Sequence, residues 1–329
     1  MKPIVGVTMG DPAGVGPEII AKALIDKGIL ELCRPVVFGS CAVMEEAFRI
    51  CGLNVDINVL DEESFAYKNG AVNILDIDNV DIESLNRGKV SGDCGKAAYQ
   101  YVEKAVELAI DGRIKAIATA PVNKESLRAA NVPFIGHTEM LEKLTGVTNP
   151  LTMFQVDSLR IFFLTRHVSL RKACDLVTEM KLYEMIKRSF AALKRLGVKD
   201  PVIAVAALNP HGGEHGLFGD EEENEIRPAI KRAADEGYNV VGPFPADSVF
   251  HFAATGKYDA VVSLYHDQGH IAAKMMNFEK TVSITNNLPF LRTSVDHGTA
   301  FDIAGTGIAS EISMIEAIRL AGVYSRFFI

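Results

Sequence analysis

The sequence predicts an α/β protein whose sheets are largely parallel. Three short apolar strands in the second half, at residues 159–164, 202–208 and 259–264, alternate with amphipathic stretches at 180–196 and 222–236. Strands that alternate with helices are joined by right-handed βαβ crossovers, and such crossovers produce parallel sheets. A length of 329 residues is typical of one large or two medium α/β domains.

The first half of the chain shows the same alternation. Residues 91–111 are its clearest helix, because Ala98, Val102 and Ala105 recur at helical spacing. The other expected helices are 19–25, 42–51 and 139–144, and the expected strands are 4–9, 35–38, 54–60, 72–75 and 116–121.

A glycine-rich turn separates the first strand from the first helix. It reads Gly-Asp-Pro-Ala-Gly-Val-Gly-Pro-Glu at residues 10–18. Such a turn can direct backbone N–H groups and a helix N-terminus at an anion, although its spacing matches neither a P-loop nor Gly-x-Gly-x-x-Gly. Pro17 and Glu18 also suit the first turn of a helix without any ligand. Both interpretations stay open.

Composition and charge narrow the class of protein. A net charge of −8 without a Lys/Arg-rich run argues against a nucleic-acid partner. No apolar run approaches the ~20 residues of a membrane span, and the first residues lack the architecture of a signal peptide. The five cysteines form no Cys-x-x-Cys pair and are odd in number, which is typical of reduced thiols: Cys33, Cys41, Cys51, Cys94 and Cys174. We therefore expect a cytoplasmic protein.

Three histidines each follow the carboxyl end of an expected strand: His167, His211 and His266. Ligand sites of parallel sheets lie outside these strand ends. Three imidazoles that share one cation and leave a position open are typical of a catalytic metal site. Three other histidines lack this placement and are expected at the surface or behind the ligands: His215, His251 and His270.

Further charged residues surround these histidines in the sequence. Lys274 and Arg292 suit a carboxylate or a phosphate, while Asp247 and Asp267 suit proton transfer or the orientation of an imidazole. The residues alone leave three classes open: a metal-assisted hydrolase, a metal-dependent dehydrogenase that reduces a nicotinamide, and a metal-stabilised binding protein without turnover.

Five motifs, in order along almost the whole chain, resemble the 4-hydroxythreonine-4-phosphate dehydrogenase family. They are Met-Gly-Asp-Pro-Ala-Gly-Val-Gly-Pro-Glu (9–18), Gly-His-Thr-Glu (136–139), Asn-Pro-His-Gly-Gly-Glu (209–214), Tyr-His-Asp-Gln-Gly (265–269) and Leu-Pro-Phe-Leu-Arg-Thr-Ser-Val-Asp-His-Gly-Thr-Ala (288–300). More distantly, the first motif and residues 297–307 resemble isopropylmalate and isocitrate dehydrogenases, in which the second segment receives the adenosine half of NAD.

The resemblance implies two α/β/α lobes of the isopropylmalate dehydrogenase type, with the active site in a cleft between them. One lobe would hold residues 1–135 and 283–329, and the other residues 136–282. It also implies a homodimer with the active site at the subunit interface. One divalent cation would be held by residues matching His167, His211 and His266, drawn from both subunits, with zinc expected and magnesium, cobalt or nickel as alternatives.

The resemblance also implies which residues bind the small molecules. Substrate contacts map onto His137, Thr138, Lys274, Ser283 and Arg292. The NAD loop maps onto Asp296, His297, Gly298, Thr299 and Asp302. Ser283 departs from the asparagine of other members, and Asn286-Asn287 replaces a small, glycine-containing pair.

The implied reaction is NAD-dependent oxidation at C3 of a 4-phosphorylated 3-hydroxy acid, followed by decarboxylation. One branch of the family oxidises 4-phosphooxy-L-threonine in pyridoxal phosphate synthesis. A sister branch converts 4-phospho-D-threonate or 4-phospho-D-erythronate into dihydroxyacetone phosphate, and His270 with residues 217–221 favours this branch. Asp247 is the first choice for proton transfer and Asp267 the second. A metal-dependent phosphoester hydrolase is the alternative from another class.

Overall fold

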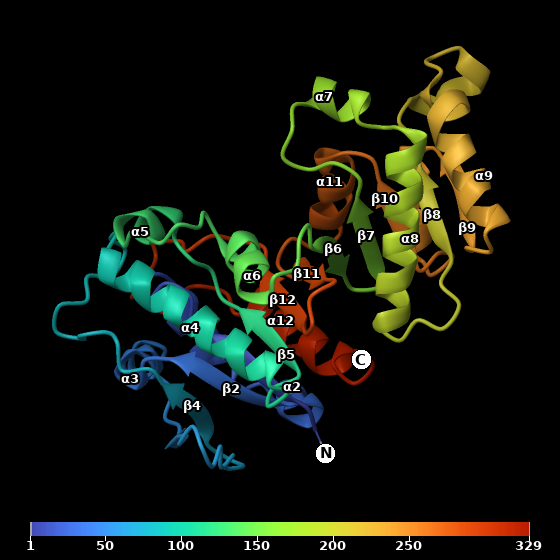
Figure 1. Cartoon of the computed structure of the whole chain (residues 1–329). Helices are drawn as coiled ribbons and strands as arrows, with labels where there is room; N and C mark the ends of the chain where they lie inside the picture. The colour runs from blue at the N-terminus through green and yellow to red at the C-terminus, as the bar shows by residue number, and fades with distance from the viewer. Residues whose placement is uncertain (1, 329) are drawn as a thin grey trace. The chain divides into compact units, whose positions relative to one another are not determined.

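The computed structural model describes residues 2–328 as two compact units. Unit 1 comprises Met1–Pro150 and Asn287–Ile329, and unit 2 comprises Leu151–Asn286. The sequence led us to expect unit limits after residues 135 and 282. The observed limits come later in the chain, after Pro150 and Asn286. Each unit has strands between helices, so the predicted α/β class is confirmed (Figure 1).

Six parallel strands form the sheet of unit 1, in the order β3-β4-β2-β1-β5-β12. Their bounds are β1 (Ile4–Thr8), β2 (Arg34–Gly39), β3 (Ile57–Val59), β4 (Val72–Asp76), β5 (Ala116–Thr119) and β12 (Leu291–Val295). Every residue of β5 is fully buried, which explains its run of small and β-branched side chains. The parallel order confirms the crossovers expected from the alternating elements.

Helices cover both faces of this sheet (Figure 1). Helix α4 packs against β1, β2 and β5, and α12 packs against β1, β5 and β12. The bounds are α1 (Gly16–Ala23), α2 (Lys27–Leu32), α3 (Cys41–Ile50), α4 (Gly92–Ile110), α5 (Lys124–Ala129), α6 (His137–Thr145) and α12 (Ile312–Tyr324). Ser91 caps α4 by accepting a hydrogen bond from the backbone N–H of Cys94.

Unit 2 combines parallel and antiparallel strands, in the order β11-β6-β7-β10-β8-β9. Strand β6 is antiparallel to both β7 and β11, whereas β7, β10, β8 and β9 are parallel. The bounds are β6 (Leu151–Val156), β7 (Leu159–Phe163), β8 (Ile203–Ala206), β9 (Val240–Phe244), β10 (Ala260–Ser263) and β11 (Val282–Asn286). The sequence pattern missed β6, β9, β11 and, in unit 1, β12.

The helices of unit 2 also lie on two faces. Helices α8 and α9 pack together on one face, and α10 and α11 pack on the other (Figure 1). The bounds are α7 (Leu170–Asp175), α8 (Glu179–Arg195), η1 (Pro210–Gly216), η2 (Glu222–Ile226), α9 (Arg227–Asp235), α10 (Ala246–Ala254) and α11 (His266–Met276). The predicted helix at 222–236 therefore begins with a π-helical turn, η2, before α9. Phe154, Ile161, Phe163, Val249 and Val261 form part of the core.

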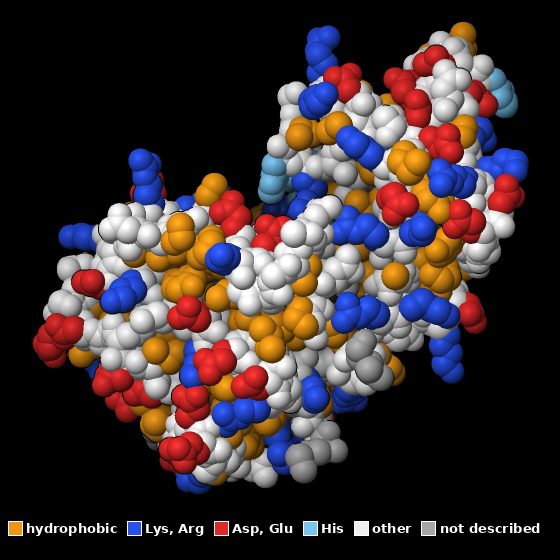
Figure 2. Space-filling model, in the orientation of Figure 1, with side chains coloured by type: hydrophobic (Ala, Val, Ile, Leu, Met, Phe, Trp, Pro, Cys, Tyr) orange, Lys and Arg blue, Asp and Glu red, His pale blue; other side chains and the backbone are white. Residues whose placement is uncertain are grey.

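The surface carries charges of both signs. On the face shown in Figure 2, acidic and basic side chains are interspersed. No helix within residues 2–328 has the length and apolar character needed to cross a membrane. The five cysteines are free; Cys33 and Cys94 are buried, and the other three are half-buried.

Candidate active site

The three strand-end histidines come from adjacent parallel strands of unit 2. Strand β10 pairs in parallel with both β7 and β8, so the carboxyl ends of all three point to one edge. His167 follows β7, His266 begins α11 directly after β10, and His211 lies in η1 after β8. The predicted placement past parallel strand ends is confirmed.

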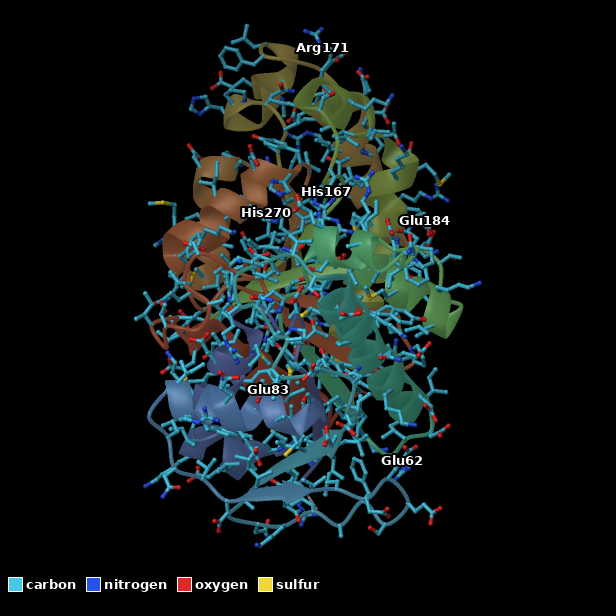
Figure 3. The ribbon with its side chains drawn as sticks, turned by 90° about the vertical axis from the view of Figure 1, so that its left-hand side faces the viewer. Glu62, Glu83, His167, Arg171, Glu184 and His270 are labelled. Carbon is cyan, nitrogen blue, oxygen red and sulfur yellow. The ribbon has the colours of Figure 1, made fainter. Side chains whose placement is uncertain are left out.

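Two of these histidines face each other. The ring centroids of His167 and His266 are 6.0 Å apart, and Figure 3 labels His167 together with His270, which lies on the same helix as His266. Two imidazoles on one tetrahedral zinc have centroids roughly 5 Å apart, given Zn–N bonds of about 2.0 Å. The observed separation is about 1 Å wider than this value.

Asp267 determines which nitrogen His266 can offer. Its Oδ1 lies 2.6 Å from His266 Nδ1. A carboxylate can only accept, so Nδ1 carries the proton and Nε2 of the neutral ring carries the lone pair. This arrangement is typical of metal-binding histidines, whose second nitrogen donates to a carboxylate. Asp247, by contrast, is exposed in the first turn of α10.

In the described part of the chain, His211 does not complete a metal site. Its backbone is left-handed, with φ of 55°, and its ring centroid lies 6.4 Å from that of Phe218. Among residues 2–328, no three His, Cys, Asp or Glu side chains gather closely enough to hold a metal. The donor types of the pair formed by His167 and His266 fit a divalent cation.

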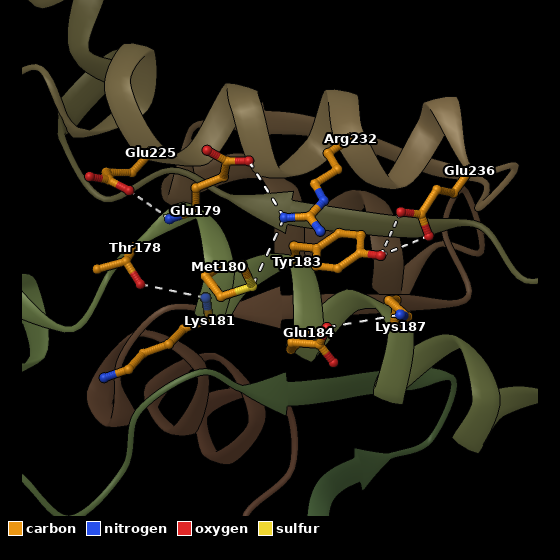
Figure 4. Close-up of polar contacts among 10 residues, drawn as sticks. All are labelled: Thr178, Glu179, Met180, Lys181, Tyr183, Glu184, Lys187, Glu225, Arg232 and Glu236. Atoms are coloured by element: carbon orange, nitrogen blue, oxygen red, sulfur yellow. Dashed lines mark hydrogen bonds and ion pairs between the residues drawn. The ribbon is translucent and has the colours of Figure 1, made fainter.

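A buried glutamate that the sequence pattern did not single out holds the loop before His211. Glu222 is fully buried, and its carboxylate accepts hydrogen bonds from Leu208 N at 2.8 Å, Asn209 N at 2.7 Å and Asn209 Nδ2 at 2.8 Å. Neighbouring Glu225 accepts from the N–H of Glu179, which ties η2 to α8 (Figure 4). Glu222 thus positions the loop instead of serving only as a helix start.

Unit 1 contains a buried cation from the predicted substrate set. Arg292 lies on β12, is 6% exposed, and donates from Nε and Nη2 to Thr119 Oγ1 at 3.1 and 2.7 Å. Burial lowers the pKa of Arg292 to about 9. The guanidinium therefore keeps its charge at neutral pH, and its fork geometry suits a phosphate or carboxylate.

His137 is within electrostatic reach of Arg292. Burial, and then the charge of Arg292, lower the pKa of His137 well below its usual range, so its imidazole is neutral at pH 7. Its Nε2 is buried and has no hydrogen-bond partner among residues 2–328. A buried polar nitrogen without a partner is costly, and a bound anion would satisfy it if Nε2 carries the proton. We call His137 and Arg292 the basic pair.

The other predicted substrate residues are more scattered. Thr138 is exposed beside His137 on α6, and Lys274 Nζ lies 5.0 Å from the ring centroid of Phe278. Ser283 is half-buried on β11, opposite Phe154 of β6. Asn286, one of the departures from the family pattern, is 1% exposed, and neither of its side-chain polar atoms has a partner in the described part of the chain.

The glycine-rich turn and the predicted cofactor loop contact each other within unit 1. Glu18 is 1% exposed and accepts from the backbone N–H groups of Gly305 and Gly307 at 2.5 and 2.7 Å. Val15 N donates to Thr299 O at 3.0 Å. Glu18 is therefore a loop anchor as well as a first-turn acid, a role the sequence pattern did not indicate.

The predicted cofactor residues line this loop in different environments. Thr299 is buried and accepts from Asn123 Nδ2 at 3.3 Å, while the ring of half-buried His297 donates from Nδ1 to Gly298 O at 2.9 Å. Asp296 is half-buried, and Asp302 is exposed. The loop thus combines an anchored backbone with an accessible carboxylate.

Comparison with known proteins decides the family. The family model described as "Pyridoxal phosphate biosynthetic protein PdxA" matches residues 31–321. The chain belongs to the PdxA family. Two curated relatives carry the name "Putative D-threonate 4-phosphate dehydrogenase". The one from Clostridium botulinum is 56% identical, over 99% of this chain and 98% of its own. The one from Fusobacterium nucleatum is 57% identical, over 100% and 99%.

Solved structures of the PdxA family agree with this assignment. A 4-hydroxythreonine-4-phosphate dehydrogenase from Burkholderia phymatum has a TM-score of 0.88 at 42% identity, covering 98% of both chains. One from Klebsiella pneumoniae has a TM-score of 0.89 at 41% identity, covering 99% of this chain and 98% of the other. The expected family is therefore confirmed, and the protein is an oxidoreductase of the dehydrogenases that act on CH–OH groups.

Proposed function

We propose that this PdxA-family protein oxidises C3 of a 4-phosphorylated 3-hydroxy acid with NAD, and that the product then loses CO₂. The names of relatives that are 56% and 57% identical over nearly the whole chain favour 4-phospho-D-threonate, with 4-phospho-D-erythronate as its close analogue. The product would be dihydroxyacetone phosphate. The alternative substrate is 4-phosphooxy-L-threonine, because family structures that are 41% and 42% identical carry the name 4-hydroxythreonine-4-phosphate dehydrogenase.

The basic pair is the observation that carries the phosphate assignment. Arg292 supplies a buried positive charge, and His137 supplies a buried nitrogen without a partner in residues 2–328. A phosphate offers several acceptor oxygens and would satisfy both groups. Thr138, Lys274 and Ser283 are proposed as further substrate contacts. Holding the phosphate would restrict the substrate's orientation before C3 reacts.

His167, His211 and His266 are proposed to hold one divalent cation, with zinc expected and magnesium, cobalt or nickel as alternatives. When bound, such a cation would polarise the C3 hydroxyl of the substrate and lower its pKa. The contact with Asp267 favours the His266 proton on Nδ1, which leaves the lone pair of Nε2 for a cation. Asp247 is proposed to accept the hydroxyl proton, while C3 passes its hydride to NAD.

The proposed NAD loop comprises residues 296–307, with contacts from Asp296, His297, Gly298, Thr299 and Asp302. Support comes from its anchoring, because Glu18 binds two of its backbone N–H groups from a buried position. Because these contacts already order part of the loop, the remaining loop residues lose little conformational entropy when they bind a dinucleotide. A cytoplasmic location is part of the same proposal.

A homodimer is proposed because helix α11 leaves an apolar stripe exposed. Ile271 and Met275 lie four residues apart on α11 and are 62% and 81% exposed, and Phe278, two residues past the end of the helix, is 65% exposed. Large apolar side chains gathered at a surface mark a site of association. The same helix begins with His266, so a second copy on this stripe would lie close to the incomplete histidine group.

The test is NAD reduction at 340 nm with 4-phospho-D-threonate, 4-phospho-D-erythronate and 4-phosphooxy-L-threonine, each with and without a chelator. We expect NADH with the first or second substrate, and loss of activity after chelation. NADH from 4-phosphooxy-L-threonine alone would assign the chain to the alternative substrate. Release of phosphate without NADH would favour the hydrolase instead.

A further inference from the structure

We propose that His270 is a positioning residue that holds the ring of His266 in the orientation needed to bind a metal. The inference rests on the proposed function, in which His266 is a metal ligand. His270 itself contributes no ligand and lies one helical turn further along α11. Three contacts of the His270 side chain support this role.

The first contact is a parallel ring stack. The imidazoles of His266 and His270 have centroids 3.6 Å apart, and their planes differ by only 11°. Residues four apart on a helix face the same side, but an aligned stack at this distance restricts rotation of both rings. The His266 side chain is 38% exposed, so without the stack one of its faces would be open to solvent.

The second contact is a hydrogen bond back to the same residue. His270 Nδ1 lies 2.9 Å from the backbone oxygen of His266. Because a carbonyl only accepts, Nδ1 of His270 carries a proton, which fixes the orientation of the His270 ring. The first residue of α11 is thus held by its backbone and by its ring.

The third contact connects His270 to the sheet. Its ring centroid lies 4.3 Å from that of Phe154 on β6 and 4.5 Å from that of Phe163 on β7. Both phenylalanines belong to the buried core of unit 2. The two core rings therefore fix the position of the His270 ring, and the His270 ring in turn fixes the position of the His266 ring.

The backbone at the start of α11 is fixed by contacts of its own. Gln268 accepts from Leu264 N and donates to Ala207 O, each at 2.8 Å. A Cβ at Gly269 would lie 2.6 Å from a ring carbon of Phe163, so the helix must approach β7 closely here. The backbone of α11 is thereby fixed, and the remaining freedom of His266 lies in its side chain, which His270 and Asp267 hold from two sides.

Zn²⁺ affinity of the full-length protein, measured by competition with a chromophoric chelator, tests the inference. We expect His270→Ala to weaken Zn²⁺ binding about tenfold, the lower end of the effect seen when a supporting residue of a metal ligand is lost. His270→Phe keeps a ring without the Nδ1 donor, and His270→Asn keeps a donor without the ring. We expect the phenylalanine to restore more of the affinity, together with the wild-type visible spectrum of the Co²⁺-loaded protein. The matched control is His251→Ala, which removes an exposed histidine of α10.

A purely structural histidine would lower the melting temperature and leave Zn²⁺ affinity and the Co²⁺ spectrum unchanged, and that result would overturn the inference. His266→Ala separates this failure from failure of the proposed function. If His266→Ala weakens Zn²⁺ binding and folded His270→Ala and His270→Phe do not, only the role of His270 is wrong. If His266→Ala binds Zn²⁺ as the wild type does, the metal site and the inference both fail.

Discussion

The basic pair of unit 1 and the strand-end histidines of unit 2 differ in how complete each group is within one chain. Arg292 and His137 are held by β12 and the first turn of α6, with their functional nitrogens buried. His167 and His266 approach each other at a partly exposed edge, and no third ligand joins them within residues 2–328. The described residues bring both members of the first group together, whereas they bring only two histidines of the second group close to each other.

This difference has a physical cause. A buried cation and a buried, unpartnered imidazole nitrogen cost folding free energy, so the surrounding sheet must hold them in place before any ligand binds. Exposed His167 and partly exposed His266 carry a smaller cost of this kind, because solvent can reach their ring nitrogens. Anion binding should therefore depend mainly on the basic pair of unit 1, and metal binding on the proposed association.

The largest expected effect is that of Arg292→Met, which removes the buried charge at nearly constant length. We expect kcat/KM for 4-phospho-D-threonate to fall by roughly 10²–10³, because losing one member of a buried charge-assisted contact costs about 3–4 kcal/mol. Inorganic phosphate should no longer raise the melting temperature, while Zn²⁺ affinity should not change. Arg319→Met, which removes a half-buried guanidinium of α12 that pairs with Glu316, is the control. A retained phosphate effect would refute the basic pair.

A charge placed in the exposed apolar stripe of α11 should weaken metal binding by the strand-end histidines. Met275→Asp should prevent dimerisation, because a carboxylate would have to be desolvated at an apolar interface. We expect sedimentation to show monomers and Zn²⁺ affinity to fall about tenfold or more, whereas phosphate should still raise the melting temperature. Val59→Asp, at an exposed position of the edge strand β3, is the control. A monomer with intact Zn²⁺ affinity would contradict a site shared between copies.

Replacement of Glu222, which holds the loop before His211, should have a smaller effect on stability and metal binding. Glu222→Gln replaces a carboxylate that accepts three hydrogen bonds, and one amide lobe can no longer accept. We expect about 1–3 kcal/mol less free energy of unfolding, measured with urea, and weaker Zn²⁺ binding. Phosphate should stabilise the variant as it does the wild type. Exposed Glu223→Gln serves as the control, and equal stability of the two variants would remove the anchoring role.

The smallest expected effect is the pH dependence caused by His137. Its pKa is lowered in the folded state, so on acidification below about 6.5 the unfolded chain binds a proton before the folded chain does. The contribution of neutral His137 is therefore complete above that pH and declines as pH falls toward the folded-state pKa. Urea unfolding at pH 7.5 and 5.5 should show a smaller acid loss for His137→Gln than for the wild type. His215→Gln controls for loss of an exposed imidazole, and equal losses in wild type and His137→Gln would contradict the assignment.

Some elements were predictable from local pattern, and others were not. Helix α4 and strand β5 follow simple periodicity or continuous burial, so their residues indicate them directly. Strand β12 reads Leu-Arg-Thr-Ser-Val, and its three central polar residues are all buried. A strand that carries site residues conflicts with the apolar pattern of its own secondary structure, which explains why it was missed.

By itself, the sequence determined the α/β class, the family, and the placement of three histidines past strand ends, because these depend on residue type and order. Only the tertiary structure decided which side chains meet. The anchors Glu18 and Glu222 act on loops through backbone N–H groups, and backbone donors have no sequence signature. The stack of His270 on His266, and the contact of His270 with Phe154 and Phe163, likewise require the packing of α11 on β6 and β7.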